Sequence, residues 1–371
     1  MNTPWFELYR YDLPLSRPLN VKGKVLTRRT GLIVGLEVDG RKGYGDIAPL
    51  PGISREDLQT AINEAMHLGK ANKRQLNSVR MERLQQNIRT QPVFLGWTPS
   101  VRFGFDTAIC SIYGQMTSGC MLPDLGKDAP NFVLLSGLLT GSLEEVAEKA
   151  RRLRENGYRS AKLKVGARTL EEDIQAVRAA REALGPDIPL RLDANRAWDY
   201  DTALQFGKAV AALNIDYIEE PFPNVWRFQE FAGSSGLPVA LDEAVREMTP
   251  RDVESVSWAK VLILKPTLLG GRDRLYSFVK AADRQKLKCV VSSTFESGYG
   301  LLVLAHLAAD IGGEDVPSGL DTFDWLQSDL LTEPIIVRQG RLYLEDVLRC
   351  LATLDTSRLE LIGHAECTLP N

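Results

Sequence analysis

Short apolar runs return every 20 to 30 residues from about residue 131 onward, separated by polar segments with helical spacing such as LEEVAEKARRLRENG. The runs are FVLLSG at 132, AKLKVG at 161, LRLDAN at 190, YIEEP at 217, VALDEA at 239, KVLILKP at 260 and KCVVSS at 288. This alternation is typical of repeated β–α units on a parallel sheet. Seven runs, with a candidate eighth near PSGLD at 317, predict a closed barrel rather than an open sheet.

The first 125 or so residues have a different pattern, which predicts an α+β domain. Residues 5–12 and 31–38 run apolar or alternate between turn signals, so we expect strands of a small antiparallel sheet. A helical pattern extends over 54–89, with Ser54 as its N-cap. One buried face of that helix is predicted from residues four positions apart: Leu58, Ile62 and Met66. A second helix is predicted over 100–116.

The tail from residue 334 reads PIIVRQGRLYL, which predicts a hairpin that returns to the N-terminal domain. The predicted fold is therefore α/β: a (β/α)7β TIM-like barrel with an N-terminal α+β capping domain completed by the C-terminal tail. We place the capping domain at 1–128, the barrel at 129–333 and the returning segment at 334–371.

Composition narrows the class of protein without changing this fold. The 371 residues are 44% hydrophobic and 25% charged, with a formal net charge of −3. That charge gives no basic field for nucleic acid or for a membrane surface. No run reaches the roughly 18 apolar residues of a membrane span, and the N-terminus lacks a signal-peptide core. We therefore expect a cytoplasmic protein that acts on a small molecule. The sequence leaves its oligomeric state open.

Histidine and cysteine are scarce and are not arranged for chemistry. The three histidines, His67, His306 and His364, stand away from every charged run, which argues against a zinc site and a Ser-His-Asp triad. The five cysteines have no paired spacing, which disfavours disulfides and a thiolate metal site; they are Cys110, Cys120, Cys289, Cys350 and Cys367.

Charged residues occur where buried parallel strands rarely have them. Five of the seven runs carry charges toward their C-terminal ends: Lys162 and Lys164, Arg191 and Asp193, Glu219 and Glu220, Asp242 and Glu243, and Lys265. Residues two apart on a strand share a face, and the C-terminal strand ends form the active-site mouth of such a barrel. The pattern places all five groups at that mouth.

Three carboxylates, Asp193, Glu219 and Asp242, come from consecutive runs and can converge on one point. Clustered anions repel unless a cation lies among them. Because the set contains no histidine or cysteine, it suits Mg²⁺ or Mn²⁺ better than zinc. Lys164 and Lys265 lie four strands apart, hence on opposite walls, with one lysine for each face of a bound substrate.

A lysine acts as a base only after losing its proton, and its ordinary pKa of about 10.4 is too high. Neighbouring cations lower that pKa, and both Lys162 and a bound metal would act as such cations. Taken singly, a strand-end acid is more often a helix cap or a salt-bridge partner, and KLK could lie on an exposed edge strand. The opposite strand parity of Glu220 and Glu243 favours supporting roles. The joint pattern favours a catalytic site.

These residues resemble those of the enolase superfamily and, within it, the o-succinylbenzoate synthases of menaquinone biosynthesis. The resemblance covers nearly the whole chain, in family order: GYGDIAPLPGIS at 43–54, PSVRFGFDTAI at 99–109, AKLKVG at 161–166, RLDANRAW at 191–198, IEEP at 218–221, LDEA at 241–244, LKPTLLGG at 264–271, VSSTFESGYGLLVLA at 291–305 and SGLDTFD at 318–324. RLDANRAW and SSTFES with the following GL are specific to the synthase branch. The carboxylates are shared across the superfamily, whose sites pair a lysine or histidine base with Mg²⁺.

The resemblance implies that the three carboxylates bind Mg²⁺ and that a Mg²⁺-dependent lyase takes a small carboxylate substrate. It implies that Lys164 is the base, and also the acid, in a syn dehydration of 2-succinyl-6-hydroxy-2,4-cyclohexadiene-1-carboxylate, with Lys265 as a stabilising cation opposite. Lys162 and Arg191 would hold the carboxylate. The succinyl tail would meet residues of the last strands: Ser292, Ser293 and Gly319.

Two departures from the family pattern stand in the capping domain. Asp46 replaces a common glutamate, and extra residues lie at about 67–95. Arg28 and Arg29 fall in the loop expected to cover the site, either against substrate carboxylate or in solvent.

Three rival functions use the same features differently. An N-succinylamino-acid racemase or dipeptide epimerase would need both lysines as opposed acid and base, but the spacing Asp321-x-x-Asp324 departs from the Asp-x-Asp usual in epimerases. A Schiff-base aldolase would leave the carboxylates unexplained. A non-catalytic barrel would not need charged strand ends.

Overall fold

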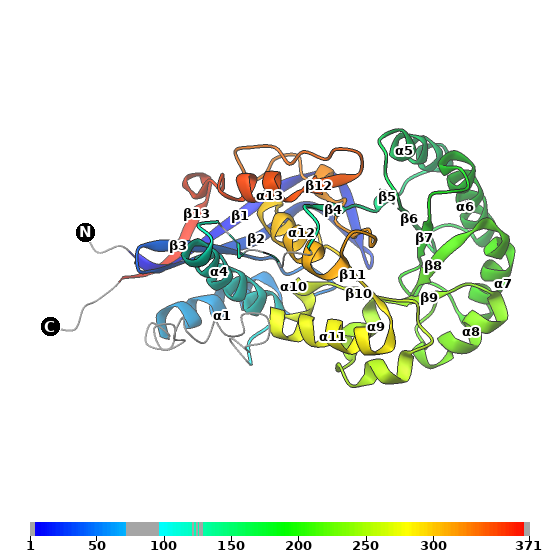
Figure 1. Cartoon of the computed structure of the whole chain (residues 1–371), viewed down its shortest axis with the longest axis horizontal. Helices are drawn as coiled ribbons and strands as arrows, with labels where there is room; N and C mark the ends of the chain where they lie inside the picture. The colour runs from blue at the N-terminus through cyan, green and yellow to red at the C-terminus, as the bar shows by residue number, and fades with distance from the viewer. Residues whose placement is uncertain (1–3, 72–95, 121, 124, 126–128, 367–371) are drawn as a thin grey trace.

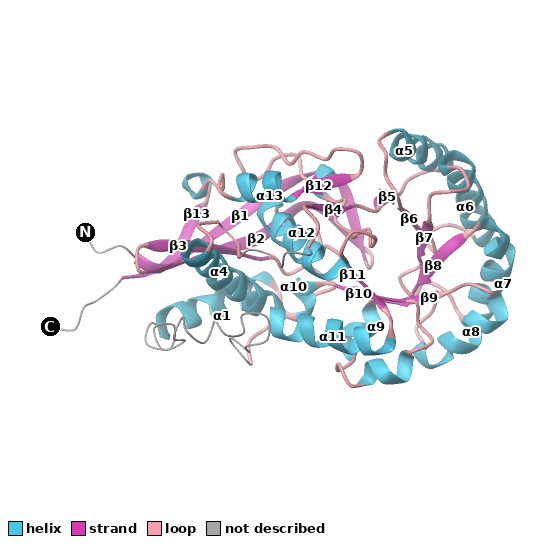
Figure 2. Cartoon of the chain, viewed as in Figure 1, coloured by secondary structure: helices cyan, strands magenta, loops and turns pink. Residues whose placement is uncertain are grey.

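The structure, a computed structural model, describes residues 4–71, 96–120, 122–123, 125 and 129–366. Figure 1 shows two parts: long antiparallel strands lie at the end that holds both termini, and a curved row of short strands with helices outside it fills the other end. Figure 2 shows the outer helices following one another around that row. No described helix has the length and apolar character needed to cross a bilayer.

The capping domain is built on a four-stranded antiparallel sheet in the order β13-β1-β2-β3. Its strands are β1 Pro4–Val21, β2 Lys24–Val38, β3 Arg41–Ile47 and β13 Glu360–Glu366. Helices α1 Leu58–Ala71 and α4 Pro99–Thr117 share a buried core with the sheet. The predicted sheet and second helix are confirmed, although the strands run further than the apolar runs suggested.

The predicted start of the first helix is wrong by three residues. Asp57 is the capping residue, since its Oδ1 accepts a hydrogen bond from the Thr60 amide at 2.7 Å. Ser54 instead accepts a bond from the Leu50 amide at 2.9 Å and closes the preceding turn. The half-buried Ile62 and Met66 pack against the capping core as expected. The rest of the predicted helix, beyond residue 71, lies outside the described residues.

Seven parallel strands form the barrel wall, in the sequential order β5 to β11. They are β5 Gly137–Leu139, β6 Ala161–Lys164, β7 Leu190–Asp193, β8 Ile215–Glu219, β9 Val239–Leu241, β10 Val261–Leu264 and β11 Lys288–Val291. The helices around them are α5 Leu143–Glu155, α6 Leu170–Leu184, α7 Tyr200–Val210, α8 Phe228–Ser235, α9 Glu243–Glu247, α10 Pro266–Leu269, α11 Arg272–Gln285 and α12 Gly298–Gly312. Helices α5 and α6 begin at capping boxes, Ser142 with Glu145 and Thr169 with Glu172.

The ring closes through the predicted eighth run. Ser318 bridges in parallel to Leu135, and Gly319 bridges to Ser292 just after β11. A Cβ at Gly319 would come within 2.5 Å of the Ser292 hydroxyl, so glycine permits this approach. One prediction needs correction: the run at 132 splits in two, and only its second half enters the barrel, as β5.

The first half of that run is β4, Phe132–Leu134, which pairs with β12, Arg341–Tyr343. A tight turn at 338–341 gives the predicted hairpin. Helix α13, Leu344–Leu351, follows, and β13 then pairs with β1 in the capping sheet. The exact division of the chain at 128 and 333 stays a prediction.

Arg28 and Arg29 lie on strand β2 and not in a loop, so their predicted position is wrong. Arg28 is exposed and pairs with Asp12 at 2.7 Å. Arg29 is 1% exposed and donates to four backbone carbonyls, those of Thr30, Ala48, Pro49 and Phe295, at 2.6–2.9 Å. It joins the capping domain to the loop after β11, and four of its five N–H groups are used for these bonds.

Replacing Arg29 with methionine should therefore destabilise the protein and not act through substrate binding. We expect a loss of roughly 3–5 kcal/mol in the free energy of unfolding, because the buried carbonyls lose their donors and the buried Asp46 loses a nearby cation. Chemical denaturation measures this loss. Arg28→Met, on the exposed face, is the matched control and should change stability by less than about 0.5 kcal/mol. Equal effects of the two substitutions would contradict this role.

Candidate active site

The three predicted carboxylates meet at the C-terminal end of the barrel. Asp193 ends β7, Glu219 ends β8 and pairs in register with Asp193, and Asp242 follows β9. One carboxylate oxygen from each lies within 4.8 Å of the others, and the three side chains are 2% exposed or less. An all-oxygen, buried, trianionic set suits a hard divalent cation. These residues fit a metal site by position and by donor type.

Three lysines balance these charges. The Lys162 ammonium donates to Asp193 and Glu219, both at 3.2 Å, and Lys164 donates to Asp193 at 2.6 Å. Lys265, which follows β10, donates to Asp242 at 2.5 Å. The anions that would repel one another are thus held together by three cations, two from β6 and one from the end of β10.

The electrostatic environment differs among the members of this cluster. Burial, which disfavours a carboxylate, raises the pKa of Glu219 to about 8. Burial acts in the same sense on Asp193, but Lys164 and Lys162 outweigh it and hold the pKa of that carboxyl well below its usual range. Burial opposes the charge on Lys265, yet Asp242 and Glu243 outweigh it and raise the pKa of the ammonium group. Without an added cation, the lysines do not offset the effect of burial on Glu219 as they do on Asp193.

The two lysines proposed as base and counter-cation approach the cluster from different sides. Lys164 reaches it from β6 and Lys265 from the end of β10, four strands along the ring. Lys164 is the most accessible of the three lysines, with 38% of its side chain exposed against 13% for Lys162. Lys164 therefore has the reach to meet a substrate, and Lys162 lies beneath it.

Asn195 is a site residue that the sequence reasoning did not single out. Its Oδ1 accepts a hydrogen bond from the Lys164 ammonium at 2.8 Å, and its Nδ2 donates to Glu243 at 3.2 Å. The partners fix the orientation of the amide, because an ammonium only donates and a carboxylate only accepts. Asn195 adopts φ +46°, a left-handed conformation that asparagine tolerates. Its position two residues after Asp193, just beyond the end of β7, was the available signal.

Glu220 supports the metal ligands and does not face the mouth, as its strand parity suggested. The side chain is fully buried, and one oxygen accepts from the amides of Asp242 and Ala244 at 3.0 and 2.9 Å. The other oxygen accepts from Arg196 at 2.7 Å. Burial raises the pKa of Glu220 to about 7. The carboxylate fixes the backbone that presents Asp242.

Changing Glu220 to glutamine should weaken metal binding while the fold persists. Glutamine has one acceptor oxygen, so its NH₂ group would face either the two amides or Arg196, all of which are donors. We expect the metal affinity to fall about 10- to 100-fold, as for other partners of ligating groups. Isothermal titration with Mn²⁺ measures the affinity. Glu247→Gln, which alters the exposed partner of Arg196, is the control and should leave the affinity near wild type.

Arg191 does not belong to the cluster, and the prediction that it holds the substrate carboxylate needs correction. It is in register with Lys162, but its guanidinium donates to Asp216 at 3.3 Å and to the Pro317 carbonyl at 2.7 Å. It also lies over the Tyr217 ring at 5.1 Å. Asp216 and Pro317 stand at the N-terminal ends of their strands, so Arg191 closes the barrel floor.

The last predicted residues lie together where the ring closes. The Ser292 hydroxyl donates to the Gly319 carbonyl at 3.2 Å. The Ser293 hydroxyl lies 2.8 Å from that of Thr322, and its amide donates to Gly319. All three flank the mouth on the side away from the carboxylates, although Ser293 already has a buried partner.

The histidines take no part in this site. His306 bonds to the Pro123 carbonyl at 2.9 Å, His67 packs against Trp97, and His364 lies on β13. Four cysteines are free, and Cys367 lies outside the described residues.

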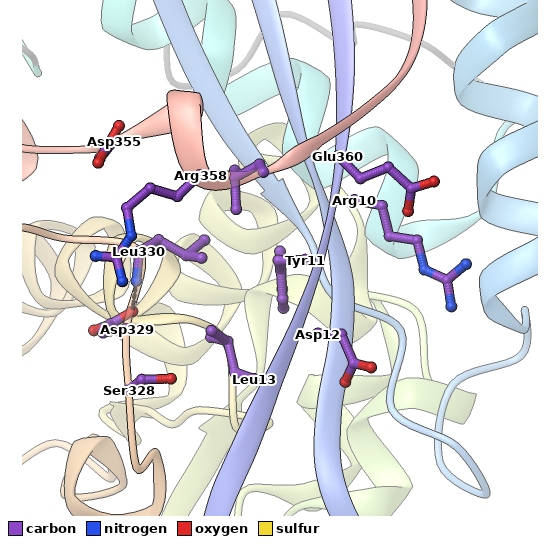
Figure 3. Close-up of a pocket in the computed structure, with 11 residues that line it drawn as sticks. Arg10, Tyr11, Asp12, Leu13, Ser328, Asp329, Leu330, Asp355, Arg358 and Glu360 are labelled. Carbon is purple, nitrogen blue, oxygen red and sulfur yellow. Dashed lines mark hydrogen bonds between the residues drawn. The ribbon is translucent and has the colours of Figure 1, made fainter.

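A separate cavity with a volume of about 500 Å³ lies beside β1 and shares no residue with the carboxylate cluster. Figure 3 shows its arginines, Arg10 and Arg358, among the carboxylates of Asp12, Asp329 and Glu360. We assign it no role in the chemistry of the mouth.

Comparison with known proteins agrees with this geometry. Residues 145–348 match the family model described as enolase C-terminal domain-like, and residues 4–112 match that of the MenC N-terminal domain. The o-succinylbenzoate synthase of Pectobacterium atrosepticum is 34% identical over 327 residues, covering 87% of this chain and 92% of that protein. The synthase of Vibrio cholerae is 33% identical over 335 residues, covering 88% and 91%.

Solved structures confirm the fold. The L-Ala-D/L-Glu epimerase of Bacillus subtilis superposes with a TM-score of 0.77 at 22% identity, over 98% of this chain and all of that one. Muconate lactonizing enzyme of Pseudomonas fluorescens gives 0.75 at 22% identity, over 96% and 95%. At this identity the likeness concerns architecture: a barrel with a capping domain. Two family models, relatives that share a third of their residues along most of the chain, and the fold agree: the chain belongs to the o-succinylbenzoate synthase family of the enolase superfamily.

Proposed function

We propose that this chain is an o-succinylbenzoate synthase, which dehydrates 2-succinyl-6-hydroxy-2,4-cyclohexadiene-1-carboxylate to 2-succinylbenzoate. The observation that carries the proposal is the buried Asp193–Glu219–Asp242 cluster, approached by Lys164 from one side and Lys265 from another. Acid–base chemistry beside a carboxylate needs these groups: oxygen ligands for a cation and an amine within reach of the α-carbon.

Asp193, Glu219 and Asp242 would hold the metal, and Mg²⁺ is the ion we propose, with Mn²⁺ as a substitute. When bound, such a cation stabilises the enediolate of the substrate and lowers the pKa of adjacent ammonium groups. The raised pKa of Glu219 supports a cation at this point, because the lysines alone leave it incompletely compensated.

Lys164 would carry both proton transfers. Its neutral amine takes the proton from the carbon beside the carboxylate, and the electrons of that C–H bond form the enediolate. The resulting ammonium then gives a proton to the hydroxyl on the same face of the ring, the C–O bond breaks, and water leaves as the ring becomes aromatic. Asn195 holds the amine through its Oδ1. Lys265 stays charged on the other wall and stabilises the enediolate.

Lys162 would support the substrate carboxylate from below, since its ammonium lies between Asp193 and Glu219. Ser292 and Gly319 would meet the succinyl end. The hydroxyl of Ser293 is occupied by Thr322, so we propose that Ser293 contributes through its backbone.

Asp321 and Asp324 favour dehydration over epimerisation of amino-acid derivatives. Asp321 accepts bonds from the Leu138 amide at 3.2 Å and from the Tyr158 hydroxyl at 3.0 Å. Asp324 pairs with Arg17 at 3.2 Å, at an exposed position. Both oxygens of Asp321 thus already accept hydrogen bonds within the protein, and Asp324 is paired with Arg17 at the surface.

The test is conversion of the cyclohexadiene acid by the purified chain, followed by NMR of the product. We expect 2-succinylbenzoate to form with Mg²⁺, to stop forming after exhaustive EDTA dialysis, and to form again with Mg²⁺ or Mn²⁺. Full activity in the dialysed protein would contradict the role given to the carboxylates.

A further inference from the structure

One side of the barrel mouth is sealed by apolar side chains. They come from the β1–β2 hairpin, the loop after β3, strand β5 and the loops after β11 and Gly319. The buried members are Leu15, Leu19, Val21, Leu50 and Trp325, with Leu138 and Phe295 packed against them. Phe295 meets Trp325 edge to face at 5.2 Å. No dianion would cross this contact, since it would have to shed its water among hydrocarbon groups.

Next to this seal the mouth is open. A cavity with a volume of about 340 Å³ lies between the tip of the β1–β2 hairpin and the loops that follow β7 and β9. Asn195 and Glu243 form its inner wall, and Asn195 is the residue bonded to Lys164. The cavity therefore extends to the residue that holds the proposed base.

The outer wall of this cavity is basic. Lys22, Arg55 and Arg246 line it, and the first two are exposed. Neither Lys22 nor Arg55 forms an ion pair with any residue that the structure describes. Arg246 donates to the Ile53 carbonyl at 2.5 Å.

The acidic residues of the wall are already engaged. Glu247 pairs with Arg196, which also binds Glu220, and Glu243 accepts from Asn195. The cavity is lined by four cationic side chains, those of Lys22, Arg55, Arg196 and Arg246, against the carboxylates of Glu243 and Glu247, so its net charge is positive.

We propose that this cavity is the route by which a dianionic dicarboxylate enters the mouth, and that Lys22 and Arg55 attract it. The inference rests on the proposed function, because the cyclohexadiene substrate and 2-succinylbenzoate both carry two carboxylates. Fixed cations beside a narrow opening raise the local concentration of an anion and the rate of its association, an effect that salt screens. Such groups increase the association rate constant of the ligand and have little effect on its dissociation rate constant once it is bound.

The test measures the kinetics of product binding and not turnover, so it stands apart from the test of the reaction. Stopped-flow tryptophan fluorescence gives the association and dissociation rate constants of 2-succinylbenzoate with the Mg²⁺-loaded protein, at low and high salt. Lys22 lies in the hairpin turn at φ +48°, so Lys22→Asp, which tolerates that conformation, is the variant to use. We combine it with Arg55→Glu. The association rate constant should fall by about tenfold at low salt, and its salt dependence should flatten.

Lys286→Asp is the matched control, since Lys286 is also an exposed lysine in the left-handed region, at φ +58°, but stands at the other end of the barrel before β11. It should leave the association rate constant at the wild-type value. An unchanged rate constant in the double variant would overturn the proposal. A change confined to the dissociation rate constant would also overturn it, because the two residues would then bind the seated ligand.

Discussion

Replacing Lys164 with arginine should remove essentially all dehydration, whereas the same change at Lys265 should leave a measurable rate. Guanidinium stays protonated near neutral pH, so it keeps the charge of either lysine but cannot act as a base. A positioned general base contributes typically 10²- to 10⁴-fold, and we expect kcat to fall by about that factor in Lys164→Arg. Lys265→Arg preserves the opposing cation. The fall in kcat of this variant should therefore be smaller than the roughly 10²-fold fall that follows removal of such a charge.

Steady-state assay of both variants with the cyclohexadiene acid, beside N-succinylamino acids, tests the assignment. Dehydration on one face needs one titrating group, while racemisation needs one on each face. Any racemisation should therefore disappear in both variants, including Lys265→Arg. Wild-type dehydration by Lys164→Arg would show that Lys164 is not the base, and Lys162, two residues away on the same face, would become the candidate.

The second large effect should come from the carboxylate cluster. Asp242→Asn keeps the shape of the side chain but removes the charge that faces Lys265. Activity should fall by more than about 10²-fold, since even the outer partners of metal ligands typically account for 10- to 100-fold. The fold should persist. Asp193→Asn should be the less stable variant, because Asp193 accepts from both Lys162 and Lys164 and its loss leaves two ammonium groups undercompensated.

Circular dichroism, thermal unfolding and Mn²⁺ titration separate these effects. We expect folded Asp242→Asn protein without measurable metal binding. Asp201→Asn, at an exposed position on α7, should resemble wild type in all three measurements. Tight metal binding by Asp242→Asn would remove this residue from the ligand set.

The barrel and the positions of its carboxylates were predictable because both depend on short periodic signals. Parallel strands stay in register with their neighbours, so acids at the ends of consecutive runs must meet. Strand parity also placed Glu220 away from the mouth. Strand parity did not predict which end of the barrel a side chain points to. Lys162 and Arg191 pair in register, yet Lys162 points to the carboxylates and Arg191 points to the barrel floor. The carbonyl that fixes Arg191 belongs to Pro317, which no local pattern connects to it.

The errors in the capping domain have the same origin. Arg29 is held by carbonyls 1, 19, 20 and 266 residues away in the sequence, so its charge suggested an exposed group where the fold buries one. Ser54 and Asp57 are both good capping residues, and tertiary packing decides between them. Asn195 was missed because its importance depends on Lys164, which comes from another strand.

The most direct test of the central claim is a side-by-side assay of the wild-type chain with Mg²⁺, with and without chelator. The cyclohexadiene acid is one substrate, and a panel of N-succinylamino acids and dipeptides is the other. We predict that chelator-sensitive dehydration has a kcat/KM well above that of any racemisation or epimerisation. Efficient epimerisation with slow or absent dehydration would contradict it.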